Sequence, residues 1–63
     1  MFLDHHLLYL AETRKNGQNV HRIINLVSVY KNLYQICSND GWTNKDVVIF
    51  QNTEKELRKL VVV

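Results

Sequence analysis

The sequence predicts an all-α fold: a small three-helix subunit, made of a helical hairpin and one short helix, that pairs into a dimeric helical bundle. The chain of 63 residues has no proline, and its two glycines lie in the polar clusters KNGQN and SNDGW, which are typical of helix ends. Between these clusters, apolar residues recur at intervals of three and four, the period of a helix. The breadth of the apolar surface on the middle segment indicates the dimer. Residues 1–63 are treated as one domain, because a chain this short is marginal even as a single folding unit.

Residues 3 to about 15 are predicted to form a short amphipathic helix. Asp4 in its first turn and Arg14 with Lys15 in its last turn carry the charges that the helix dipole favours at each end. The apolar side chains repeat at helical spacing and form one stripe: Leu3, Leu7, Leu8, Leu10 and Ala11.

Residues 20–38 are predicted to form the central helix, with Asn19 as its N-cap. One apolar stripe follows the alternating three- and four-residue spacing of a heptad seam: Val20, Ile23, Val27, Tyr30, Tyr34 and Cys37. A second stripe lies beside it: Leu26, Val29, Leu33 and Ile36. Together the two stripes cover more than half of the helix, which is broader than a surface helix requires.

This breadth predicts neighbours on two sides of the central helix. The other two segments of the chain supply one neighbour, and a second copy of the subunit supplies the other. The heptad seam is predicted as the dimer interface: Val20, Ile23, Val27, Tyr30, Tyr34 and Cys37.

Residues 44 to about 60 are predicted to form the third helix, continuous or bent near residue 52. Thr43 and Asp46 form a capping box, and Trp42 with Val47 forms a hydrophobic staple. The β-branched runs at 47–50 and 61–63 leave a strand open as the alternative there.

A second Thr with an acid three residues later, Thr53 with Glu56, raises the possibility of a second helix start and therefore of a DNA-reading helix-turn-helix. The recognition helix would then place Glu54 and Glu56 against the phosphates and bases, where acidic side chains are unfavourable. The pattern therefore favours a structural cap on a packed or bent helix.

Composition and motifs argue against several function classes. Cys37 is the only cysteine, so no internal disulfide forms and a reducing, cytoplasmic location is expected. The three histidines match no zinc spacing, and the sequence has no phosphate-binding loop, nucleophile turn or dinucleotide motif. We therefore expect no enzymatic activity, metal, cofactor or small-molecule substrate. The longest apolar run, 23–30, is far shorter than the roughly 20 residues that span a bilayer, so no membrane span is expected. The polar face of the first helix carries acids and no cationic belt, so binding to a membrane surface is not expected either.

The expected function is that of a small dimeric regulator or adaptor that binds another protein stoichiometrically, of a kind common in phages and mobile elements. Four residues are candidates for contacting the partner: Trp42, Lys55, Arg58 and Lys59. The alternative is a dimeric DNA- or RNA-binding regulator, in which pairing would double the net charge of +2 and align cations of the first two helices: Arg14, Lys15, Arg22 and Lys31.

Overall fold

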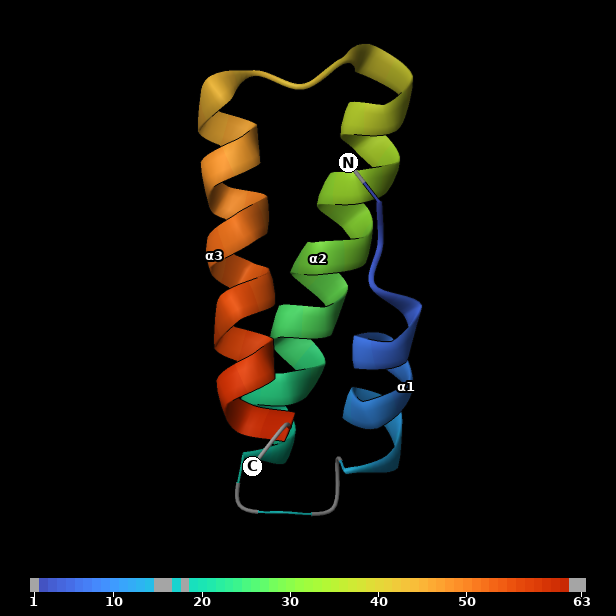
Figure 1. Cartoon of the computed structure of the whole chain (residues 1–63), viewed down its shortest axis with the longest axis vertical. Helices are drawn as coiled ribbons and strands as arrows, with labels where there is room; N and C mark the ends of the chain where they lie inside the picture. The colour runs from blue at the N-terminus through green and yellow to red at the C-terminus, as the bar shows by residue number, and fades with distance from the viewer. Residues whose placement is uncertain (1, 15–16, 18, 62–63) are drawn as a thin grey trace.

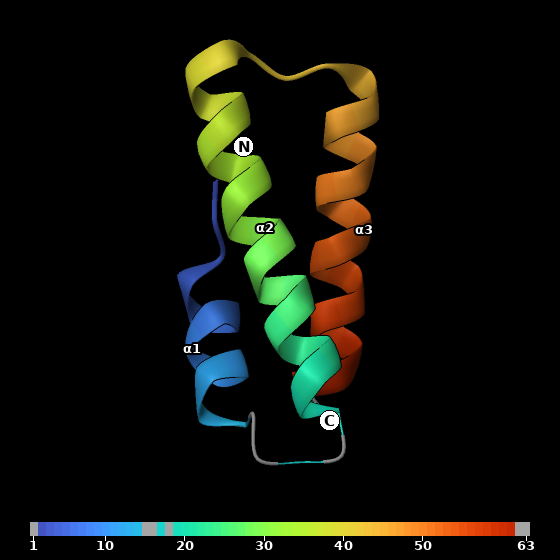
Figure 2. The same cartoon turned by 180° about the vertical axis from the view of Figure 1, so that it is seen from behind.

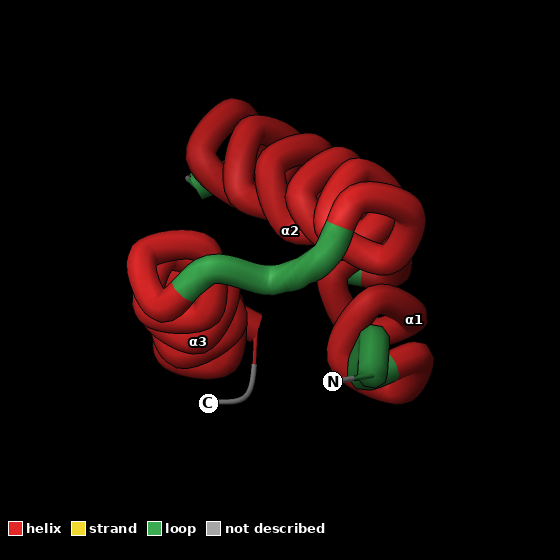
Figure 3. The backbone as a smooth tube through the Cα atoms, turned by 90° about the horizontal axis from the view of Figure 1, so that it is seen from above, coloured by secondary structure: helices red, strands yellow, loops and turns green. Residues whose placement is uncertain are grey.

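The computed structural model describes residues 2–14, 17 and 19–61, and helices are the only regular secondary structure in these ranges. It consists of α1 (His5–Thr13), α2 (Val20–Asp40) and α3 (Asn44–Val61). α2 and α3 form an antiparallel hairpin, and α1 lies along the half of this hairpin that contains the start of α2 (Figures 1 and 2). Viewed from above, the three helices occupy the corners of a triangle (Figure 3). The prediction of three helices and no strand is confirmed for the described residues.

Helix α1 is shorter than predicted because Asp4 precedes the helix as its cap. The Asp4 carboxylate accepts a hydrogen bond from the backbone N–H of Leu7 at 3.1 Å. At the other end Arg14 is the C-cap residue, and its backbone N–H donates to the carbonyl of Leu10. Lys15, which was expected in the last turn, lies outside the described residues.

Helix α2 begins at the predicted position and extends two residues beyond the predicted end. Asn19 is the N-cap, but only its backbone carbonyl contributes, accepting from the N–H of Ile23 at 2.8 Å, while its side chain makes no capping bond. The helix ends at Gly41, whose φ of 99° is a conformation that L side chains rarely adopt. The N–H of Gly41 donates to the carbonyl of Cys37 at 2.7 Å.

Helix α3 begins with the predicted capping box. The Asp46 N–H donates to the Thr43 hydroxyl at 3.1 Å, and the Thr43 N–H donates to the Asp46 carboxylate at 3.3 Å. Thr53 does not start a second helix: it lies within the continuous helix, and its hydroxyl donates to the carbonyl of Ile49 at 2.8 Å. The helix-turn-helix alternative for residues 44–60 is thereby excluded.

The strand alternative is also wrong for residues 47–50, which are helical, and Val61 is helical as well. Residues 62 and 63 lie outside the described residues. The β-branched side chains accept the helix because one face of α3 is packed. Strand preference chiefly measures packing on a sheet, and the described residues form no sheet.

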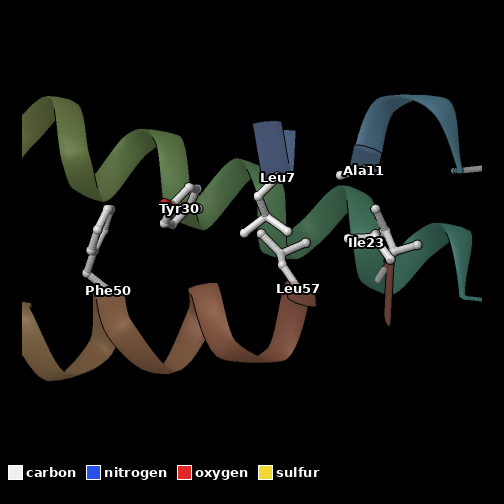
Figure 4. Packing of buried hydrophobic residues seen from close by; sticks show 7 residues of the cluster. Leu7, Ala11, Ile23, Tyr30, Phe50 and Leu57 are labelled. Carbon is white, nitrogen blue, oxygen red and sulfur yellow. The ribbon is translucent and has the colours of Figure 1, made fainter. Parts of the chain in front are cut away.

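The core is a single cluster to which every helix contributes. Leu7 projects from α1 toward Leu57 of α3, and Tyr30 of α2 lies over Phe50 of α3 (Figure 4). The buried members are Leu7, Ala11, Ile23, Tyr30, Phe50, Leu57 and Val61. At the other end of the hairpin, where α1 does not extend, the rings of Tyr34, Trp42 and Phe50 pack together. We call this part of the hairpin the aromatic end.

Candidate interaction surface

The heptad seam predicted as a dimer interface faces the interior of the single subunit. Ile23, Tyr30 and Cys37 are buried, with at most 4% of their surface exposed. Val27 and Tyr34 are half-buried and pack against the core, and Val20 is half-buried. The physical reason is that α3 folds back along α2 while α1 covers the adjoining side, so the chain covers this seam by itself. A surface between two copies must therefore use side chains that remain exposed.

The second apolar stripe of α2 is only partly covered. Val29 is 47% exposed and Ile36 is 58% exposed. Leu26 and Leu33 are half-buried and pack against the core from the edge of the same stripe. Exposed charged residues continue the spacing at both ends, and we name the resulting row the outer seam: Arg22, Leu26, Val29, Leu33, Ile36 and Asp40.

An ion pair fixes how the outer seam lies beside α3. The guanidinium of Arg22 contacts the carboxylate of Glu56 at 2.9 Å, and this contact holds the pKa of Glu56 below its usual value. Val29 lies seven residues after Arg22, and Ile49 lies seven residues before Glu56. Because the two helices are antiparallel, these equal steps bring Ile49 to the flank of Val29. Ile49 is itself 39% exposed, so it widens the apolar surface across the hairpin.

A polar network joins all three helices on the opposite side, beside α1. The Tyr30 hydroxyl accepts from the Asp4 backbone N–H at 3.0 Å and donates to the Glu54 carboxylate at 2.6 Å. Arg58 contacts Asp4 at 2.9 Å and Glu54 at 3.4 Å. Burial of Tyr30, reinforced by its bond to Glu54, raises the pKa of the hydroxyl to about 12. The pKa of Asp4 is lowered, first by its bond from the Leu7 N–H and then by Arg58. The network consists of Asp4, Tyr30, Glu54 and Arg58, and we call these four residues the clasp.

Arg58, one of the four predicted partner contacts, belongs to the clasp, which the sequence did not predict. Arg58 already bonds its own chain, although its side chain keeps about half of its surface in solvent (54%). Asp4 and Arg58 are 54 positions apart, so no local spacing connects them. The available hint was a tyrosine within an apolar seam, because a buried hydroxyl requires a partner.

Trp42, the second predicted contact, is half-buried and belongs to the aromatic end of the hairpin. Its ring meets Phe50 edge to face at 5.1 Å and lies 6.3 Å from Tyr34. The rings of Tyr30 and Phe50 stack at 4.5 Å. Much of the Trp42 ring is therefore used in packing within the subunit.

Lys55 and Lys59, the remaining predicted contacts, are exposed on α3. They lie one helical turn apart, so their ammonium groups share one side of the helix. Lys45 is also exposed, and its spacing of fourteen residues from Lys59 returns it close to the same side. The structure thus keeps a lysine row on the outward side of α3.

A groove of about 940 Å³ runs between α1 and α2. Its apolar lining includes Leu3, Leu8 and Tyr34, and its polar lining includes His5 and Lys31. Within the described ranges, no group of three or more His, Cys, Asp or Glu side chains is arranged to hold a metal ion. The groove presents a mixed surface without a concentrated set of reactive groups.

Cys37 is buried as expected for a packing residue. Burial raises the pKa of its thiol, and the nearby Asp46 carboxylate adds to the effect. A thiol in this environment is poorly ionised and therefore a weak nucleophile.

Among the described helices, none combines the length and the apolar character needed to cross a bilayer. Comparison of the chain with protein-family models, with curated proteins and with solved structures found no match. The exposed outer seam and the lysine row are therefore the features from which a function can be argued.

Proposed function

We propose that the chain is a small non-catalytic regulator or adaptor that works in the cytoplasm as a homodimer and binds another protein stoichiometrically. The outer seam carries this proposal. A subunit with a complete core has no internal use for Val29, Ile36 and Ile49 on one face, and a row of exposed apolar side chains on a small protein is typical of an interaction site.

The lysine row supports a second surface on the same molecule. If two subunits pair, Lys55 and Lys59 are present twice, and an acidic partner surface meets two equivalent sites. Each copy of the dimer then binds one copy of the partner, which is the stoichiometry expected of an adaptor or inhibitor.

Light scattering on a sizing column tests the first part of the proposal. The chain has a mass of 7.5 kDa, so a dimer gives about twice that mass, and a monomeric mass would contradict the proposal. Native mass spectrometry of the protein with its bound partner then gives the stoichiometry. A Lys59→Glu variant should weaken that complex, while Lys31→Glu, the same charge change on α2, serves as the matched control.

The second candidate function is nucleic-acid binding, and one observation favours it. Two arginines that the sequence suggested for a cationic stripe bond their own chain, Arg14 to the Val61 carbonyl and Arg22 to Glu56, whereas the three lysines of α3 stay exposed. Among the described residues, the ion pairs given above involve none of these three lysines, so phosphates would bind the row without displacing one.

Fluorescence anisotropy with a labelled duplex separates the two functions. Nucleic-acid binding through about three phosphate contacts should weaken roughly 40-fold between 50 and 200 mM salt and should be largely lost in a Lys55→Glu/Lys59→Glu variant. Absence of binding at low salt would remove this alternative and leave the protein partner as the proposal.

A further inference from the structure

We propose that two copies of the chain pair through the outer seam, with α2 packed antiparallel on α2 of the second copy about a two-fold axis near residue 31. This arrangement rests on the homodimer proposed above and specifies its geometry. The occupant of the apolar face is thus a second copy of the same face.

The spacing of the outer seam is palindromic. From Arg22 to Asp40 the steps are four, three, four, three and four residues, and they read the same from either end. In an antiparallel pair centred at residue 31, residues equally distant from the centre face one another. Arg22 then faces Asp40 of the second copy, and the two apolar layers pair Leu26 with Ile36 and Val29 with Leu33. Alternating steps of three and four are the requirement for a continuous helix-to-helix seam.

The end charges select the antiparallel orientation. In the antiparallel pair, Arg22 and Asp40 make two attractive contacts between the copies, one at each end. In a parallel pair, Arg22 would face Arg22 and Asp40 would face Asp40, which places like charges together. Arg22 keeps its ion pair with Glu56 in the subunit, so its approach to Asp40 adds a second carboxylate to the same guanidinium.

The length of the seam suits a stable contact. From Arg22 to Asp40 the helix makes eighteen residue steps and rises about 27 Å, which is most of the 34 Å length of the subunit. Ile49 flanks the centre of the seam, so α3 of each copy adds apolar contact next to the α2 pair. The result is a central pair of α2 helices with the two α3 helices beside them.

Val48, on α3, is an exposed apolar residue that does not belong to the outer seam. Val48 is 54% exposed, but Lys45, Asn52 and Lys55 surround it at helical spacing. This makes Val48 a matched control for Ile36, because the two side chains have similar exposure and lie on different faces.

The first experiment compares Ile36→Asp with Val48→Asp by light scattering and circular dichroism. Ile36→Asp should be a folded monomer of half the wild-type mass, and Val48→Asp should remain a dimer with the wild-type spectrum. An Ile36→Asp protein that stays dimeric would overturn the proposed seam. If this variant unfolds, the cross-linking comparison below decides the arrangement independently.

The second experiment tests the orientation in a Cys37→Ala background with a short bis-maleimide. Leu26→Cys combined with Ile36→Cys should give a covalent dimer, because these positions face one another between copies. Ile36→Cys alone should give none, since its two copies lie ten residues apart along antiparallel helices, about 15 Å. Efficient cross-linking of Ile36→Cys alone would overturn the antiparallel orientation.

The two experiments separate this inference from the function on which it rests. A monomeric wild-type protein would contradict both the homodimer and its geometry. A wild-type dimer that survives Ile36→Asp, or that yields no cross-link between positions 26 and 36, would contradict the geometry alone.

Discussion

Replacing Tyr30 with Phe removes one hydroxyl from the centre of the clasp and leaves the ring in place. That hydroxyl accepts from the Asp4 N–H and donates to the Glu54 carboxylate. The ring itself stacks on Phe50 at 4.5 Å, and this contact does not involve the oxygen. The variant therefore isolates the polar contribution of Tyr30 from its packing contribution.

The expected loss follows from the two bonds. A neutral hydrogen bond contributes about 1 kcal/mol and one to a charged acceptor about 1.5–3 kcal/mol, giving roughly 2.5–4 kcal/mol in total. Part of this is recovered because the Glu54 side chain is 24% exposed and water can replace the hydroxyl there. We expect a net destabilisation of about 2–3 kcal/mol, or a Tm lower by roughly 10–20 °C for a chain of this size.

The measurement is urea and thermal unfolding followed by far-UV circular dichroism. Tyr9→Phe is the matched control, because Tyr9 is 62% exposed and its loss of a hydroxyl should change stability by less than about 0.5 kcal/mol. A Tyr30→Phe protein as stable as the wild type would refute the reasoning, since it would show that the clasp contributes nothing beyond packing.

Three further predictions concern local features. The pKa of Tyr30 is raised from 10.0 to about 12 in the folded chain, so its contribution to stability is constant below pH 10 and falls by about 3 kcal/mol in all as the pH rises from 10 to 12. Urea midpoints across this range check the prediction, and a flat profile between pH 10 and 12 would contradict it. Gly41→Ala should destabilise by about 1–3 kcal/mol because of its φ of 99°, whereas Gly17→Ala should be nearly neutral in the same thermal melts. Thr43→Ala should cost about 1 kcal/mol through loss of the N-cap. The same variant should raise the pKa of Asp46 in an NMR titration, because the bonds with Thr43 keep that pKa low. The stability that these bonds contribute is present above pH 3.8 and is lost as the pH falls below that value.

The helices could be predicted because their signals are local. The Thr43 hydroxyl and the Asp46 carboxylate bond backbone groups within one turn, so their spacing in the sequence was sufficient. Gly41 likewise ends α2 through its own backbone conformation. Thr53 looked the same in sequence but lies inside a packed helix, where burial on one face outweighs the capping preference.

The surface could not be predicted because it depends on which stripe of α2 the other helices cover. Both stripes have heptad spacing, and the choice is made by contacts distant in the sequence, such as Arg22 with Glu56 and Tyr30 with Glu54. The clasp could not be predicted for the same reason, because Asp4, Tyr30 and Glu54 are far apart in the sequence. The positions of the three helices in the sequence therefore do not determine which face of α2 is exposed.

The buried thiol of Cys37 can be used to measure how often the helical hairpin opens. The side chain lies near the aromatic end of the hairpin, where α1 does not reach, and its raised pKa suppresses reaction while the helices stay closed. A thiol reagent added in excess can label Cys37 only during excursions that separate the ends of α2 and α3. The labelling rate, divided by the rate for a free thiol, gives the population of those excursions. Because Cys37 is the only cysteine, this stability can be followed at one defined point of the fold without engineering a probe.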